Sequence, residues 1–173
     1  MGQKFLFKPL DNMQVTQHFG ENNACMPING GAVINCNGLN PPKGYKSIYS
    51  GMIAHNGTDL YAPRFTPIFA SQDGVVEEYV AEEARGLGLG IITDRKYYCD
   101  EVGKDVYWKI RYWHNHTNLV KKGDKVKIGQ IIALADNTGY SSGDHLHLEG
   151  KPVEVVFNKT TKGRCLASQT TKT

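Results

Sequence analysis

The sequence lacks any run of about 20 apolar residues, the length that a helix needs to cross a membrane. Its first residues, "MGQKFLFKPLDNMQ", hold only the short apolar patch "FLF", far less than the apolar stretch of a secretory signal peptide. We therefore expect neither a membrane-spanning segment nor export by the general secretion route.

The sequence also has no large excess of one charge, because 20 basic residues stand against 17 acidic ones and the formal net charge is +3. This mild balance provides no strongly basic surface for a nucleic acid, and it favours at most an anionic polymer such as a cell wall. We expect neither a nucleic acid nor a membrane as partner.

Cysteine is sparse and scattered, because Cys25, Cys36, Cys99 and Cys165 form no C-x-x-C pair. This spacing is poor for a structural zinc site. A bridge between Cys25 and Cys36 would close a small loop, but without an export signal we expect the thiols to be reduced.

Helix signals are almost absent, since only "VAEEARG" suits a short helix and its pattern is ambiguous. Apolar residues alternate in "DVYWKIRYWH" (105–114), and Gly, Asn and Asp pairs interrupt the apolar runs at short intervals. This pattern predicts an all-β fold, mainly of antiparallel sheet. The other expected strands lie at 13–19, 74–81, 89–94, 125–136, 144–149 and 153–157.

A chain of 173 residues is long enough for one well-packed domain. We expect that single domain over residues 1–157, followed by a polar tail over 158–173. Within the domain, residues 21–52 are rich in Asn, Gly and Pro and show no periodicity. They predict a long insertion loop, which in a compact domain is usually functional or disordered.

The stretch "HLH" places His145 and His147 two residues apart in an expected strand, so both side chains point to one face. In "HNGTD", a turn at the Asn-Gly pair would let the side chains of His55 and Asp59 converge. A catalytic zinc ion takes three protein ligands of His, Asp or Glu type and keeps a fourth position open. His55, Asp59 and one histidine of the pair supply that count, and the other histidine is then available to carry protons.

A further histidine cluster, "RYWHNH", ends the longest expected strand, where His114 and His116 would share a face. Each motif alone has an ordinary explanation, because a lone strand histidine is usually a packed core or surface ring and HxxxD is common. Their joint occurrence in one β-rich chain favours a metal site.

Two other metal patterns fit less well. HExxH is absent, so the helical zincin arrangement does not apply. "HLHLE" is similar to the cupin pattern of HxH followed by Glu, but no histidine follows His147. A small-molecule metalloenzyme of cupin type would therefore lack a ligand.

Taken together, "HNGTD", "YWH" and "SSGDHLHLE" resemble the HxxxD, Y-x-H and S-x-G-x-H-x-H-x-E motifs of the lysostaphin-type, or LytM-like, zinc endopeptidases. "LVKKGDKVKIGQ" resembles that family's V-x-x-G-x-x-V-x-x-G-Q, and "VTQHFG" its early F-G. The resemblance covers roughly residues 13–150. It implies a β-sandwich or half-barrel core with long loops around a groove.

The resemblance also implies roles for individual residues. His55, Asp59 and His147 would bind one Zn²⁺ per chain, and His114 and His145 would be the catalytic pair. Water on the zinc would attack the scissile amide, with one imidazole as general base and the other stabilising the oxyanion.

The same comparison of motifs bears on five more positions. Glu149 corresponds to a common family residue that is not a ligand, and His18 and His116 have no counterpart and are expected at the rim. The segment before His55 is longer than usual in the family, and would place Tyr45 and Tyr49 of residues 21–52 against the substrate.

The implied function is that of a zinc metallo-endopeptidase acting on the peptide stems or cross-bridges of bacterial peptidoglycan. The bond stays open between a glycine bridge and a D-amino-acid cross-link to diaminopimelate, and the single-domain build favours the second. The alternative is a non-catalytic, LytM-like wall-binding or structural component of a phage tail or virion. Without an export signal we expect action at the wall as a phage lysis protein (an endolysin) or a virion component, the latter with phage tail proteins as partners.

Overall fold

The computed structural model describes residues 6–48, 52, 54–83, 86–158 and 163–167. Every helix or strand in these ranges is a β-strand, so the described chain includes no helix that could cross a membrane. The prediction of an all-β fold is confirmed, and "VAEEARG" begins as the end of a strand rather than a helix.

The strands follow one another along the chain as β1 Val15–Gln17, β2 Ala24–Pro27, β3 Ile34–Asn35, β4 Tyr45–Ser47, β5 Thr58–Tyr61, β6 Pro67–Phe69, β7 Gly74–Glu82, β8 Gly86–Thr93, β9 Tyr97–Cys99, β10 Lys104–Asn118, β11 Lys125–Val126, β12 Ile131–Ala135, β13 His145–Asn158 and β14 Gly163–Ala167. The two runs expected at 144–149 and 153–157 are one long strand, β13, whereas the run expected at 125–136 is divided into β11 and β12.

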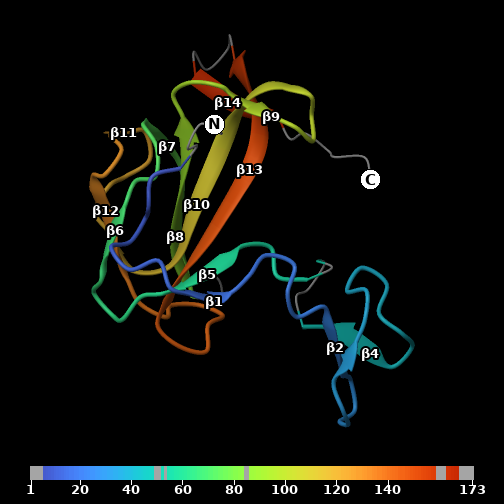
Figure 1. The fold of residues 1–173 in the computed structure, drawn as a ribbon. Coiled ribbons are helices and arrows are strands. Elements are labelled where there is room, and N and C mark those ends of the chain that lie inside the picture. Colours follow the sequence, from blue (N-terminus) through green and yellow to red (C-terminus); the bar gives the residue numbers. More distant parts are fainter. Residues whose placement is uncertain (1–5, 49–51, 53, 84–85, 159–162, 168–173) are drawn as a thin grey trace.

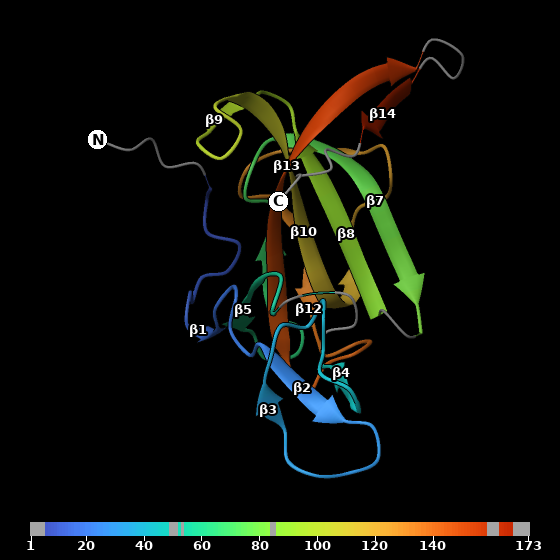
Figure 2. The same cartoon turned by 90° about the vertical axis from the view of Figure 1, so that its right-hand side faces the viewer.

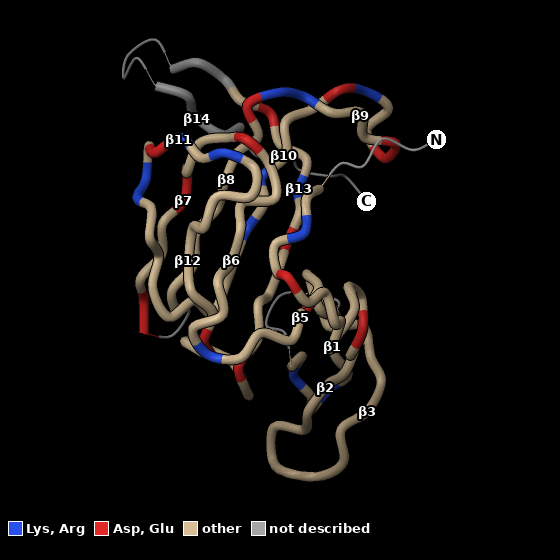
Figure 3. The backbone as a smooth tube through the Cα atoms, turned by 60° about the vertical axis from the view of Figure 1, so that its left-hand side comes forward, with Lys and Arg blue, Asp and Glu red and all other residues tan. Residues whose placement is uncertain are grey.

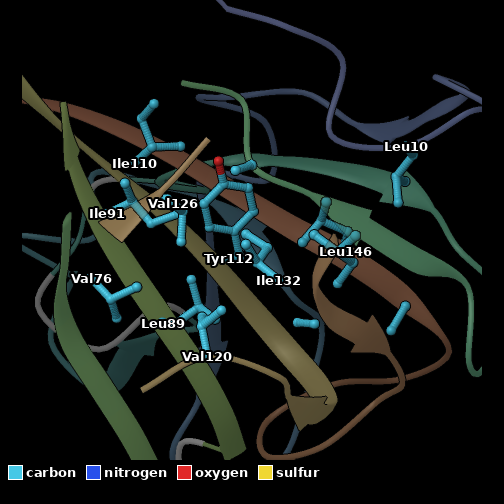
Figure 4. Packing of buried hydrophobic residues seen from close by; sticks show 14 of the residues in the cluster. Leu10, Val76, Leu89, Ile91, Ile110, Tyr112, Val120, Val126, Ile132 and Leu146 are labelled. Atoms are coloured by element: carbon cyan, nitrogen blue, oxygen red, sulfur yellow. The ribbon is translucent and has the colours of Figure 1, made fainter. Parts of the chain in front are cut away.

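The main sheet is antiparallel throughout, in the order β1-β5-β13-β10-β8-β7-β11. Its long strands β7, β8, β10 and β13 run side by side through the centre of the molecule (Figure 1). β12 pairs with the end of β10 and with β6, so these short strands fold back over one face of the long ones. The hydrophobic core fills the space between them (Figure 4).

Alternation along β10 explains why this core forms. Ile110 and Tyr112 are fully buried in the core, while Lys109 and Arg111 point to the opposite face of the sheet. The Tyr112 hydroxyl accepts a hydrogen bond of 2.8 Å from the backbone N–H of Ser71, and burial raises its pKa to about 12. The long strands are therefore fixed from one side by packing, which leaves the other face available for polar side chains.

The segment expected as a long loop, 21–52, contains a second sheet. Three short antiparallel strands pair in the order β3-β2-β4 and project from one end of the molecule (Figure 2). We call residues 21–48 the insert. Tyr49 lies outside the described residues.

The expectation of reduced thiols is wrong for the insert, because Cys25 and Cys36 form a disulfide. Pairing of β2 with β3 brings their Cα atoms to 5.7 Å, within the usual range for such a bond. The expectation rested on an argument about redox compartment, which carries no information about how close two strands bring their cysteines.

At the other end of the chain, β14 pairs with the last residues of β13 in an antiparallel hairpin. Part of the segment expected as a polar tail therefore belongs to the sheet. The domain boundary at residue 157 stays a prediction.

Candidate metal centre

The candidate site forms where β5 and β13 lie side by side at one end of the long strands (Figure 1). The register of this antiparallel pair sets Asp59 directly opposite His147, and residues in such positions bring their side chains close together. His55 precedes β5 in an irregular loop, as the Asn-Gly pair after it predicts.

Three donor atoms converge at this point. The Nδ1 of His147 lies 2.8 Å from Asp59 Oδ1 and 2.9 Å from His55 Nε2. His55 Nε2 and Asp59 Oδ1 are 3.2 Å apart. The structure therefore brings together the three residues that the sequence predicts, close enough for their atoms to hold one metal ion.

The donor set fits zinc in both type and spacing. Zinc binds His nitrogen and carboxylate oxygen at about 2.0–2.2 Å, and a tetrahedral arrangement then separates the donor atoms by roughly 3.3 Å. Burial acts to raise the pKa of Asp59, but its hydrogen bond with His147 and the nearby histidines hold that pKa below its usual value. Asp59 is therefore ionised, as a metal ligand must be.

Hydrogen bonds on the outer side of the two histidines decide which ring nitrogen faces the centre. His55 Nδ1 lies 3.0 Å from the carbonyl oxygen of His18, which can only accept, so Nδ1 carries the proton and Nε2 the lone pair. His147 is turned the other way, with its Nε2 3.4 Å from Glu149 Oε1 and its Nδ1 towards Asp59. Such outer partners orient metal-binding histidines and raise their basicity.

The pKa of His147 reports the same environment. Burial acts to lower it, but hydrogen bonds to Asp59 and Glu149 raise it to about 9. His147 therefore carries a proton on Nδ1 near neutral pH in the metal-free protein, and a metal ion must displace that proton in order to bind.

Gly57 makes the close packing of this corner possible. A Cβ at this position would lie 2.6 Å from His147 Nε2 and 2.7 Å from the Leu148 carbonyl oxygen. Both distances are too short for any side chain, so the loop between His55 and Asp59 can pass over His147 only with glycine here.

His114 and His145, the expected catalytic pair, lie together beside these three residues. Their ring centroids are 4.7 Å apart, and the His114 ring is 5.9 Å from that of His147. The Nδ1 atoms are 2.7 Å from the carbonyl oxygens of Thr138 and Gly143 respectively, so the Nε2 atom of each ring is the one left to act on a substrate. Burial lowers the pKa of His114 to about 4 although the Thr138 carbonyl opposes this, so the ring is neutral near pH 7.

A break in the strand explains how His114 reaches the site. In regular alternation it would point to the core side with Tyr112, but the register of β10 against β8 shifts between Trp113 and Asn115. His114 has φ = 65°, a left-handed conformation that costs a residue with a side chain on the order of 1–3 kcal/mol. This bulge turns His114 towards His145 instead.

The same irregularity corrects the expectation that His114 and His116 face one place. The His116 ring packs edge-on against Phe65 with centroids 4.6 Å apart, and its Nδ1 bonds Thr117 Oγ1. His18 has an exposed side chain and contributes its carbonyl oxygen to His55.

A cleft of about 750 Å³ opens over the five residues. The insert contributes Ile48, and Met52 follows it, whereas Tyr45 is not among the described residues that line the cleft. Other lining residues come from β1, the loop before β5, β10, β13 and the loop before β13, and they are Gln17, Asn56, Trp113, Gly139, Tyr140, Ser141, Ser142 and Glu149.

The sequence did not predict the polar contacts behind His147. Asn56 Nδ2 donates to Glu149 Oε1 at 2.6 Å, and Arg111 Nη1 donates to Glu149 Oε2 at 3.2 Å. Burial acts to raise the pKa of Glu149, but the His147 hydrogen bond and the charges of Lys151 and Arg111 lower it to about 2. The sequence shows that Arg111 lies on the strand face opposite Ile110 and Tyr112, but its pairing with Glu149 depends on the register of β10 against β13.

Comparisons with known proteins agree with this geometry. Residues 53–159 match the family model of Peptidase family M23. The chain is 33% identical over 149 residues to the peptidoglycan DD-endopeptidase ShyC of Vibrio cholerae, covering 86% of this chain and 27% of that protein. It is 33% identical over 111 residues to lysostaphin of Staphylococcus simulans, covering 62% of this chain and 20% of that protein. The chain thus spans about a quarter of the length of these curated relatives or less.

Solved structures share the fold. A zinc containing peptidase from Vibrio cholerae superposes with a TM-score of 0.56 at 30% identity, over 83% of this chain and 35% of that chain. The catalytic domain of lysostaphin from Staphylococcus simulans superposes with a TM-score of 0.50 at 33% identity, over 61% of this chain and 71% of that chain. The predicted likeness to the lysostaphin-type fold is confirmed.

Proposed function

The chain belongs to peptidase family M23, and on that premise we propose that it hydrolyses peptide cross-links of bacterial peptidoglycan with zinc as its metal. The observation that carries the proposal is the convergence of His55 Nε2, Asp59 Oδ1 and His147 Nδ1 within 3.2 Å of one another. Relatives named as peptidoglycan endopeptidases support the substrate class.

His55, Asp59 and His147 would hold the ion, one per chain. When bound there, zinc would act as a Lewis acid on the scissile carbonyl and would lower the pKa of a water molecule, so that this water can lose a proton and attack the carbonyl carbon. Two neutral nitrogens and one carboxylate leave the ion with a net positive charge, which suits this task.

His114 and His145 would move the proton. A neutral imidazole accepts a proton at Nε2 as the water oxygen bonds to the carbonyl carbon, and returns it to the amide nitrogen as the C–N bond breaks. In its protonated form the second imidazole can donate a hydrogen bond to the developing oxyanion. His114 is neutral near pH 7, so its Nε2 lone pair is available to accept a proton.

For the bond cleaved, we propose a D-amino-acid cross-link to diaminopimelate rather than a glycine bridge. The similarity to the DD-endopeptidase ShyC extends over 86% of the chain, against 62% for lysostaphin and 55% for the glycyl-glycine endopeptidase ALE-1. Mass spectrometry of the muropeptides released from walls of each type identifies the bond.

A non-catalytic wall-binding component is the less favoured function. A member without activity has no need to keep the three metal-binding side chains and both further histidines in one cleft, as this chain does. The phage lysis or virion role, with tail proteins as partners, stays a prediction.

The direct test is digestion of purified sacculi from Gram-positive and Gram-negative bacteria by the zinc-loaded chain. We expect new amino termini to be released by the wild-type protein and not by the His55→Ala variant. Intact sacculi of both kinds after treatment with protein shown to contain zinc would reject the proposal.

A further inference from the structure

Glu149 is a buried carboxylate for which the proposed reaction has no use. It lies two residues after His147 on β13, so the two side chains share one face of the sheet. Only 5% of Glu149 is exposed, and its two oxygens contact different groups. Oε1 faces His147 Nε2 and Asn56 Nδ2, while Oε2 accepts from Arg111 and lies 3.2 Å from Lys151 Nζ.

Glu149 is not placed to be a ligand itself. Its Oε1 contacts the Nε2 side of the His147 ring, whereas Asp59 and His55 meet the opposite nitrogen, Nδ1. The imidazole therefore stands between this carboxylate and the point where the three donor atoms converge.

The Oε2 atom of Glu149 is fixed by a row of charges that runs across the sheet. Arg111 on β10 is directly opposite Glu149 on β13 and Gly90 on β8. Arg111 also contacts Glu78 of β7, with Nε 2.8 Å from Glu78 Oε2. This contact passes over Gly90, where a Cβ would lie 2.9 Å from Lys109 Cε and 3.0 Å from Glu78 Oε2.

The Oε1 atom is fixed from the loop that carries the other histidine. Asn56 directly follows His55, and its amide donates to Oε1 at 2.6 Å. One carboxylate oxygen therefore joins both sides of the centre, His147 through its own ring and His55 through its neighbour in the chain.

We propose that Glu149 is a positioning residue: it holds the proton of His147 on Nε2 and thereby keeps Nδ1 aimed at the metal, with Asn56 and Arg111 fixing the carboxylate. This inference rests on the proposed function, because it requires that His147 binds zinc. A purely structural Glu149 would need only Oε2 to pair with Arg111, and Oε1 would have no reason to face His147.

The test compares zinc affinity, measured by competition with a chromophoric chelator, in the wild type and in Glu149→Gln. Removing the outer carboxylate is expected to weaken zinc binding by roughly 10- to 100-fold. The matched control is Glu154→Gln, which removes a carboxylate from the same strand, one that pairs with Lys104 at 2.8 Å. Its zinc affinity is expected to equal that of the wild type.

Asn56→Ala provides a second variant in case Glu149→Gln does not fold, because Asn56 lies in a loop and makes a single neutral-donor contact to the carboxylate. It is expected to weaken zinc binding by roughly 2- to 10-fold. Nitrogen-15 shifts of the zinc-loaded protein provide a readout that needs no activity. His147 should carry its proton on Nε2, and His55 should carry its proton on Nδ1.

The outcomes separate the two proposals. If the wild type binds no zinc, the proposed function fails. If the wild type binds zinc, but Glu149→Gln and Asn56→Ala bind it equally well or His147 is protonated on Nδ1, the positioning role of Glu149 is wrong and the proposed function stands.

Discussion

The metal corner, by which we mean His55, Asp59 and His147 with the loop and strands that carry them, is built by different means from the insert. In the corner, long paired strands set the positions of His147 and Asp59, and each ring nitrogen on the outer side has a hydrogen-bond partner. The insert has strands of two to four residues, exposed apolar side chains at Ile28 and Val33, and a disulfide. It also lies before residue 53, where the family match begins.

The difference shows that the insert is stabilised by its disulfide and the metal corner by the hydrophobic core. No charged residue occurs between Glu21 and Lys43, and the chain around β3 is tan in Figure 3, the colour of residues other than Lys, Arg, Asp and Glu. A sheet this small buries too little apolar surface to hold itself together, so a covalent bond takes over that task. The corner needs none, because it is continuous with the core of the main sheet.

The largest expected effect separates chemistry from architecture within the corner. His114→Ala should lower turnover on sacculi by roughly 10²- to 10⁴-fold, because a positioned general base contributes about that much. Zinc content and the unfolding midpoint should stay close to those of the wild type. His114 is not one of the three residues that would bind the metal, and alanine keeps a Cβ at the same left-handed φ of 65°, so the backbone strain changes little. A variant that keeps full turnover would show that His114 has no part in the reaction.

The second prediction breaks the insert and leaves the corner intact. Replacing both Cys25 and Cys36 by Ser opens a loop with a sequence separation of 11, which should cost about 3 kcal/mol of local stability. Hydrogen exchange should quicken in β2 and β4 and stay unchanged in β13, with zinc content unaffected.

Added reductant is the control for this experiment. It should reproduce the fast exchange in the wild type and change nothing in the double serine variant. Fast exchange that spreads into β13 would show that the corner depends on the insert after all.

The third prediction tests how tightly the corner is packed. Gly57→Ala places a methyl group 2.6 Å from His147 Nε2, so the loop or the ring must move. We expect a loss of about 1–3 kcal/mol in the free energy of unfolding by urea, together with weaker zinc binding. Gly143→Ala is the matched control, because a Cβ there meets nothing within 4 Å. Equal stability of the two variants would contradict the close approach at Gly57.

The smallest expected effect concerns the charge row behind the corner. Burial acts to raise the pKa of Glu78, but Lys109 and Arg111 hold it below its ordinary value of 4.5. A carboxyl whose pKa is lowered by folding stabilises the protein above its unfolded pKa, and that contribution is lost as pH falls through the folded pKa. The difference in unfolding free energy between wild type and Glu78→Gln should therefore shrink from pH 6 towards acid, and a constant difference would argue against the ion pairs.

Sequence reasoning succeeded where one local pattern was enough. The spacing in "HLH" and the turn in "HNGTD" were sufficient to group His55 and Asp59 with one histidine of the later pair, because two short motifs set their directions. The choice of His147 over His145 came from the family resemblance. The all-β fold followed in the same way from alternation and turn residues.

It failed where position depends on pairing between distant strands. The bulge that turns His114 away from the core exists only against β8, and the contact of Glu149 with Arg111 exists only through the register of β13 with β10. The strands of the insert are too short to show a period, so the second sheet could not be anticipated. A Cys25–Cys36 bond was considered but not favoured, because the strand pairing that brings the two cysteines together was not visible.

Anomalous diffraction at the zinc absorption edge, from crystals of the zinc-loaded protein, tests most directly whether the three donor atoms hold one ion. The account predicts a single peak about 2.0–2.2 Å from His55 Nε2, Asp59 Oδ1 and His147 Nδ1. A peak bound instead by Glu149 or by the His114 and His145 rings, with Asp59 turned away from it, would contradict the account.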